Sequence, residues 1–113
     1  MRLETAFTMD TSSIKYGRGA TREIGHDMEE LGCRRVMVVT DPGLRESLPV
    51  AVTMEALRGR GIDAVLYDGA RVEPTDRSFR EAIAFAQEGR FDGYVAVGGG
   101  SSIDTCKAAN LYA

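Results

Sequence analysis

The residues best suited to chemistry in this sequence form a glycine run, Gly98-Gly99-Gly100, which Ser101 follows. The run comes directly after the apolar segment 93–97, a predicted β-strand, and precedes a helical pattern. Glycines at such a junction let the backbone approach a bulky anion, and the N–H groups at the start of the helix hold a phosphate. We expect Gly99 to lie at the closest approach, with a positive φ and no space for a Cβ.

The spacing of the glycine run matches neither the Rossmann fingerprint GxGxxG nor the Walker pattern GxxxxGK[ST]. Two interpretations therefore stay open. The run is either a phosphate site of another kind or a tight strand–helix turn in which Ser101 is an ordinary helix cap. Ligands in open α/β sheets bind outside the carboxyl ends of the strands, which favours the phosphate site.

A second candidate is Asp41, which follows the apolar run 36–39 and Thr40. A carboxylate at the carboxyl end of a parallel strand can accept hydrogen bonds from both hydroxyls of an adenosine ribose, and it would repel a 2′-phosphate. The sequence Asp-Pro-Gly at 41–43 is also a strong turn by itself. The residues alone leave both roles open.

The remaining reactive side chains give weaker signals. Asp104 and Lys107 lie one turn apart, either as a solvent-exposed ion pair or with Asp104 in the first helical turn beside the glycine run.

His26 is the only histidine, so we predict no metal site in this chain. Cys33 and Cys106 have no CxxC spacing, which favours reduced, buried thiols over nucleophiles. We predict no catalytic residue within the chain.

Hydrophobic periodicity predicts the elements that position these residues. Helical patterns alternate with short β-prone runs, and the helix that begins at Thr75 or Asp76 has Phe79, Ile83 and Ala86 on one stripe. The predicted helices are 21–31, 47–58, 75–89 and a fourth from Ser101 or Ser102; the predicted strands are 36–39, 64–67 and 93–97; segments 5–9 and 12–16 are a short hairpin or two extended segments. The alternation predicts right-handed βαβ units and therefore an α/β, Rossmann-like parallel sheet preceded by a short β-hairpin.

Length and composition narrow the classes of partner. The chain has 113 residues with a net charge of −3, which disfavours a nucleic-acid backbone or an anionic membrane. No apolar run reaches the ~20 residues of a membrane helix, and the first residues do not lead into a signal-peptide core. We interpret residues 1–113 as one incomplete domain, the front part of a longer protein, because the last predicted helix has neither a glycine stop nor a following strand.

The segment 98–107 resembles the GGGSxxDxxK motif of the iron-containing (group III) alcohol dehydrogenases. Residues 40–43, Thr-Asp-Pro-Gly, and residues 73–75, Glu-Pro-Thr, are similar to the family's two other segments at the cofactor edge. Within that family, the hydroxyacid–oxoacid transhydrogenases resemble this chain in the segments 7–10, 71–76 and 104–113. The resemblance covers essentially the whole chain.

The resemblance implies an N-terminal domain that binds NAD rather than NADP, followed by an all-helical domain absent from this chain. That second domain would hold divalent iron or zinc on one aspartate and three histidines. The resemblance implies that Asp41 contacts the adenosine ribose, that Gly98 to Ser101 contact the pyrophosphate and that Asp104 lies near the nicotinamide. Glu73 stands where some members have asparagine. The implied cofactor-binding residues are thus Asp41, Glu73, Gly98, Gly99, Gly100, Ser101 and Asp104.

The implied activity is hydride transfer between a small alcohol or hydroxy acid, such as 4-hydroxybutyrate, and a nicotinamide cofactor or an oxo acid. The chain by itself would be inactive, and the whole enzyme would be a homo-oligomer in the cytoplasm, or in mitochondria if the source is a eukaryote. Alternatives from the same superfamily are a dehydroquinate-synthase-like or a glycerol-dehydrogenase-like enzyme. A nucleotide-binding module without chemistry of its own is the alternative from another class.

Overall fold

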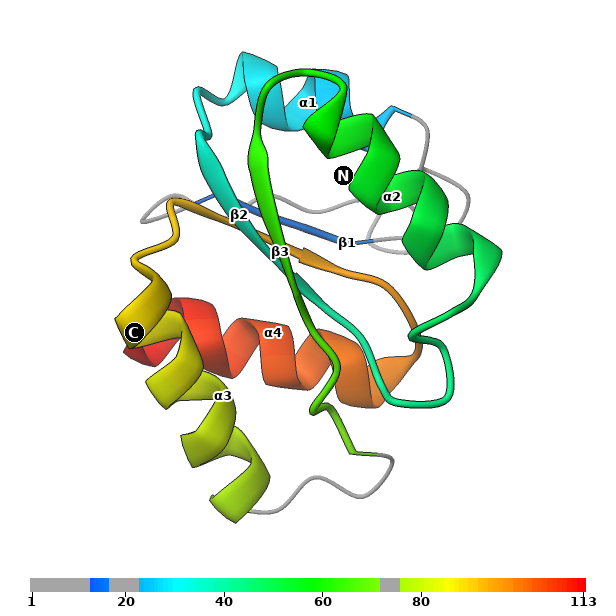
Figure 1. The fold of residues 1–113 in the computed structure, drawn as a ribbon. Helices are drawn as coiled ribbons and strands as arrows, with labels where there is room; N and C mark the ends of the chain where they lie inside the picture. The colour runs from blue at the N-terminus through cyan, green and yellow to red at the C-terminus, as the bar shows by residue number, and fades with distance from the viewer. Residues whose placement is uncertain (1–12, 17–22, 72–75) are drawn as a thin grey trace.

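The computed structural model describes residues 13–16, 23–71 and 76–113. Strands and helices alternate along the chain (Figure 1). The strands are β1 (Ser13–Tyr16), β2 (Arg35–Val39), β3 (Asp63–Tyr67) and β4 (Gly93–Ala96). The helices are α1 (Ile24–Glu30), α2 (Leu48–Arg58), α3 (Asp76–Gly89) and α4 (Gly100–Tyr112). The strands form one parallel sheet in the order β1-β4-β2-β3.

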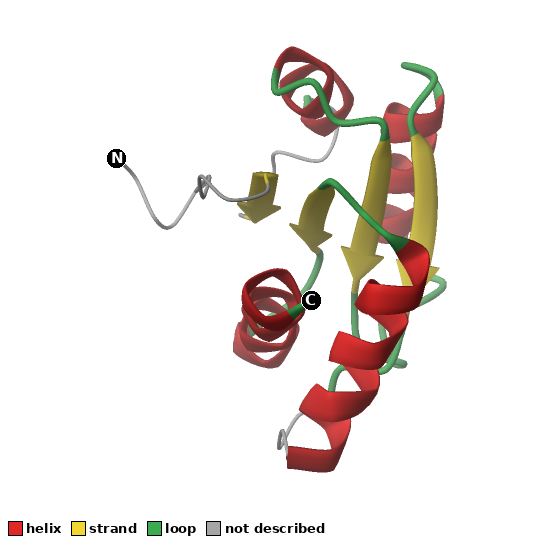
Figure 2. Ribbon diagram, turned by 90° about the vertical axis from the view of Figure 1, so that its left-hand side faces the viewer, coloured by secondary structure: helices red, strands yellow, loops and turns green. Residues whose placement is uncertain are grey.

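Helices cover both faces of the sheet (Figure 2), which explains why the four residues of β2 that follow Arg35 are all apolar. Val36 and Val38 belong to the apolar cluster beneath α1 and α2, whereas Met37 and Val39 belong to the cluster beneath α3 and α4. Successive strand residues point to opposite faces of the sheet, and helices cover both faces, so all four side chains are buried. The three-layer α/β architecture predicted from the alternation of elements is therefore confirmed.

The strand order creates a reversal in the direction of winding. From β2 the chain passes through α2 to β3, and from β3 it passes through α3 to β4 on the other side of β2. The helix that follows β2 and the helix that follows β4 consequently lie on opposite faces of the sheet. A crevice opens between two adjacent strands of this kind, outside their carboxyl ends.

The opposite, amino edge of the sheet is closed by polar contacts. The carboxylate of Asp92, just before β4, accepts hydrogen bonds from the backbone N–H groups of Arg34 and Arg35 at 2.9–3.1 Å. The Arg35 guanidinium forms an ion pair with Asp63 and lies over the ring of Phe91. These side chains tie the starts of β2, β3 and β4 together.

Residues 13–16 of the N-terminal segment are extended, as expected, and the structure adds their partner strand. Residues 13–16 form β1, and they pair with β4 in parallel, from Ser13 opposite Gly93 to Tyr16 opposite Ala96. The other half of the predicted hairpin, 5–9, lies outside the described residues. Local turn signals cannot reveal this pairing, because the two segments lie far apart in the sequence. Which strands become neighbours depends on the strand order of the whole sheet.

Two helices differ in detail from the prediction. In α3 the buried residues are Ser78, Ala82 and Ala86, while Phe79 and Ile83 are only half-buried. Small residues face inward because α3 packs closely against α4. Ser47 occupies the predicted N-cap of α2, yet its side chain makes no capping hydrogen bond. None of the helices in the described ranges is long and apolar enough to cross a membrane.

Candidate functional site

Thr40 anchors the carboxyl edge of the sheet. Its buried hydroxyl donates to the backbone carbonyl of Val97 at 2.7 Å. Its N–H donates to the carbonyl of Tyr67 at 2.9 Å, and its own carbonyl accepts the N–H of Ala70 at 3.2 Å. The segments that leave β2, β3 and β4 are thereby held together, and the loops that follow β2 and β4 start from fixed positions.

The glycine loop leaves β4 through Gly98, whose φ is +142°. A Cβ at Gly98 would lie 2.6 Å from the hydroxyl of Ser102 and 3.3 Å from Cδ1 of Leu44. Only glycine fits this conformation and this space. The expectation of a positive φ at Gly99 is therefore wrong, because the reversal that directs the chain into α4 occurs one residue earlier.

Gly99 and Gly100 form the open side of the loop. Gly99 has an extended conformation, with φ −90° and ψ −161°, and is the N-cap of α4. A Cβ at either glycine would meet no described atom within 4 Å. No side chain among the described residues caps the helix, so its first N–H groups can bind an external acceptor. The sequence analysis placed the start of this helix too late, at Ser101 or Ser102, whereas α4 begins at Gly100. The alternative that Ser101 caps the helix is also wrong, because the N-cap is Gly99.

Asp41 takes part in the turn that follows β2. Its Oδ1 accepts the N–H of Leu44 at 3.1 Å, and its backbone carbonyl accepts the same N–H at 3.1 Å. The Leu44 side chain reaches the position above Gly98, so this turn and the glycine loop touch. Because Oδ1 closes the turn, Oδ2 is the oxygen available for a ligand within the described part of the chain.

The other predicted site residues lie as follows. Ser101 is the second residue of α4 and is half-buried. Asp104 is exposed and lies in the second turn of α4, because the helix begins at Gly100; the first turn contains no acidic residue. Glu73 lies outside the described residues. The structure thus brings Asp41, the glycine loop and Ser101 to one edge, with Asp104 one turn further along α4.

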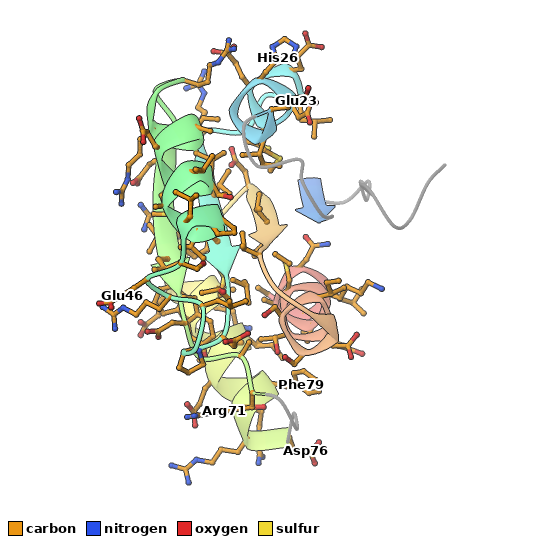
Figure 3. All side chains as sticks on the ribbon, turned by 90° about the vertical axis from the view of Figure 1, so that its right-hand side faces the viewer. Glu23, His26, Glu46, Arg71, Asp76 and Phe79 are labelled. Atoms are coloured by element: carbon orange, nitrogen blue, oxygen red, sulfur yellow. The ribbon has the colours of Figure 1, made fainter. Side chains whose placement is uncertain are left out.

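The histidine and the cysteines lie apart from this edge or inside the protein. Exposed His26 pairs with Glu30 at 3.3 Å on α1, at the end of the molecule opposite Arg71 and Phe79 (Figure 3). Cys33 and Cys106 are buried thiols outside any disulfide, as predicted, and burial raises the pKa of Cys106 above its usual range. The described residues contain no group of three or more side chains able to hold a metal ion.

The sequence analysis did not predict the contacts of three residues that complete this edge: Thr40, Leu44 and Ser102. The only available signals were a threonine at the end of a buried run and a second serine after the glycines. Their contacts join the segment after β2 to the segment after β4, and a local pattern cannot show contacts of that kind.

Comparisons with known proteins place the chain among characterised relatives. The family model of iron-containing alcohol dehydrogenase matches residues 11–113. The mitochondrial hydroxyacid–oxoacid transhydrogenase of Homo sapiens is 56% identical over 108 residues, and that of Xenopus laevis is 57% identical over 107 residues. These alignments cover 96% and 95% of this chain but 23% of each relative, so the chain spans about a quarter of their length.

Solved structures show the same fold. A 1,3-propanediol oxidoreductase matches 94% of the chain with a TM-score of 0.75 and 31% identity. The NADH-dependent butanol dehydrogenase A of Thermotoga maritima matches 94% of the chain with a TM-score of 0.74 and 26% identity. In both, the match covers 27% of the solved chain. With the family model matched over residues 11–113, these likenesses show that the chain belongs to the iron-containing alcohol dehydrogenase family.

Proposed function

We propose that this chain is the NAD-binding part of an oxidoreductase that transfers hydride between a small alcohol or hydroxy acid and an oxo acid. The observation that carries the proposal is the position of Asp41 and the glycine loop on adjacent strands, β2 and β4, whose following helices lie on opposite faces of the sheet. Dinucleotides bind at such a switch point. The names of the transhydrogenase relatives support the substrate class.

The residues present fit a dinucleotide. Gly99 and Gly100 leave an uncapped helix start open to a pyrophosphate, since no described atom would contact a Cβ at either position. In the proposal, Gly98 to Ser101 bind the pyrophosphate through backbone N–H groups, and Asp41 accepts the ribose hydroxyls. Asp104 lies toward the nicotinamide side. Glu73 is proposed as a further cofactor contact.

The charge of Asp41 favours NAD over NADP. A carboxylate placed at the ribose repels a 2′-phosphate, and the loss of one hydrogen bond to the 2′-hydroxyl adds to the discrimination. Bound NAD supplies the hydride acceptor and donor, while this chain holds the adenosine and pyrophosphate so that the nicotinamide is fixed in place.

Among the described residues, no group of three or more side chains could hold the family's divalent iron or zinc. We further propose that the whole protein acts on small molecules as a homo-oligomer. Its compartment would be the cytoplasm, or mitochondria in a eukaryote. The names of the transhydrogenase relatives support the second alternative, since they call those proteins mitochondrial.

A nucleotide-binding module without its own chemistry is the alternative, and isotope transfer separates the two. The full-length protein is incubated with 4-hydroxybutyrate deuterated at C4 and with 2-oxoglutarate, and the 2-hydroxyglutarate formed is analysed by mass spectrometry. We expect deuterium at C2 of the product and succinic semialdehyde as the second product. The hydroxyl proton of 4-hydroxybutyrate is released to water, and the new hydroxyl of 2-hydroxyglutarate takes a proton from water. A protein that binds NAD yet transfers no deuterium to any oxo acid, and reduces no NAD with any alcohol, would contradict the enzymatic proposal.

A further inference from the structure

Helix α4 contains two buried hydroxyls that have no hydrogen-bond partner in the described part of the chain, those of Ser102 and Thr105. Both residues are completely buried. A buried hydroxyl without a partner destabilises a fold, and most such groups in proteins are paired. An unpaired hydroxyl in this position therefore calls for an explanation, such as a partner that is present only in another state of the protein.

Ser102 lies directly beneath the glycine loop. Its Oγ is 2.6 Å from the position that a Cβ on Gly98 would occupy, so the hydroxyl packs against the Cα of that residue. Thr105 lies three residues further along α4, away from the loop. Both hydroxyls are thus buried and without a hydrogen-bond partner in the described part of the chain, but only that of Ser102 lies against the glycine loop.

The peptide group that joins Gly98 to Gly99 can turn at low cost. The two torsion angles that rotate it, ψ of Gly98 and φ of Gly99, both belong to glycine, which tolerates conformations that other residues rarely adopt. Gly99 also has open space around the position of a Cβ. Because the peptide is planar and trans, turning its N–H outward turns its C=O inward.

We propose that Ser102 is a positioning residue for the cofactor phosphate, an inference that rests on the proposed function. When a phosphate binds at the loop, the Gly98–Gly99 peptide turns its N–H toward the phosphate and its carbonyl toward the helix. The Ser102 hydroxyl then donates to the carbonyl of Gly98, four residues earlier, in the back-bond that helical serines commonly form. The hydroxyl is unpaired without cofactor and paired with it.

This arrangement makes the Ser102 hydroxyl stabilise the bound state only. An interaction present in one state and absent from the other shifts the equilibrium toward the first by its full free energy. Removal of the hydroxyl should therefore weaken cofactor binding without loss of stability in the free protein. A serine that merely packed beneath the loop would behave differently, because its removal would lower stability and affinity together.

The test compares Ser102→Ala with the matched control Thr105→Val in the full-length protein. Both substitutions delete a buried hydroxyl that lacks a partner, so both should leave the thermal midpoint without ligand unchanged or higher. Affinities for NAD, ADP-ribose and adenosine are measured by calorimetric titration. We expect Ser102→Ala to weaken NAD and ADP-ribose about tenfold, a difference of about 1.4 kcal/mol. Adenosine, which has no phosphate, should bind equally to all three proteins.

Each other outcome overturns the inference. If Ser102→Ala binds NAD and ADP-ribose as tightly as the wild type, the hydroxyl does not contribute to cofactor binding. An equal loss of affinity in Thr105→Val, or a loss of adenosine binding in Ser102→Ala, indicates a general effect on α4. A fall in both midpoint and affinity of Ser102→Ala indicates a packing role. If the wild-type protein binds neither NAD nor ADP-ribose, the proposed function itself is contradicted. Failure of the proposed function can thus be distinguished from failure of the inference about Ser102.

Discussion

The carboxylate of Asp41 closes the turn after β2, and in the proposed function the same carboxylate also accepts the ribose. One oxygen closes the turn to the N–H of Leu44 at 3.1 Å, as Asp-Pro-Gly predicts. A carboxylate can accept several hydrogen bonds, so the contact with Leu44 leaves it able to accept the ribose hydroxyls in the proposed function. The turn would then orient the carboxylate, and Leu44 links the turn to Gly98.

Replacement of Asp41 by asparagine separates the turn from the charge. The amide oxygen of Asp41→Asn can still accept the N–H of Leu44, so the thermal midpoint should change little. Because repulsion of a 2′-phosphate is lost, the preference for NAD over NADP should narrow about tenfold, or about 1.4 kcal/mol. The ratio of the two dissociation constants is measured by titration of the full-length protein. An unchanged ratio would remove Asp41 from the ribose site.

The sequence correctly predicted where these residues stand relative to the strands: Asp41 follows β2, and the glycines follow β4. Their contacts with a cofactor stay predictions. Residue-level prediction failed for Thr40, which bonds to a carbonyl 57 residues away, and it placed the positive φ on Gly99 instead of Gly98. Those properties arise when β2 and β4 pair, and no window of sequence contains both strands.

At the scale of elements, the hydrogen bond from Thr40 to Val97 joins the loops that leave β2 and β4. Thr40→Val keeps the shape of the side chain and leaves the Val97 carbonyl without this buried donor. We expect a loss of about 1–2 kcal/mol in the free energy of unfolding. Urea denaturation of the full-length protein measures it, provided that the transition is two-state.

Thr53→Val is the matched control for Thr40→Val. The Thr53 hydroxyl also donates to a backbone carbonyl at 2.7 Å from a buried side chain, but that carbonyl, of Pro49, lies within α2 and keeps its helical N–H partner. Its loss should cost much less. Equal losses in the two variants would show that Thr40 does not tie the loops together.

The order and type of most elements were predictable because apolar periods of 3.6 and 2 residues distinguish helix from strand. The pairing of β1 with β4 was not, and neither was the start of α4 at Gly100. Glycines are poor helix formers, so local preference places the start later. The inward stripe of α3 also shifted to Ser78, Ala82 and Ala86, since contact with α4 favours small side chains.

At the scale of the whole molecule, the described surface carries several exposed large apolar side chains. Leu48, Leu111 and Tyr112 are 73%, 61% and 65% exposed, and β3 is an edge strand of the described sheet. Apolar side chains and free strand edges both promote association. The 113-residue chain expressed alone should therefore self-associate, as measured by light scattering. A monodisperse monomer at moderate concentration would contradict this expectation.

The central claim, that the glycine loop holds a cofactor pyrophosphate, is tested by Gly99→Val in the full-length protein, with Gly98→Ala as its control. A Cβ at Gly99 meets no described atom within 4 Å, whereas a Cβ at Gly98 meets Ser102 in a positive-φ conformation. Gly98→Ala should therefore lower the thermal midpoint, at a cost of at least about 1 kcal/mol.

The decisive measurement compares two properties of Gly99→Val with those of the wild type: the NAD affinity, by titration, and the thermal midpoint, by scanning calorimetry. The account predicts that the midpoint stays near that of the wild type while NAD affinity falls at least about tenfold, since the branched side chain fills the space of the phosphate. Retained affinity with a midpoint that collapses would show that residues 98–100 are a structural turn and would contradict the account.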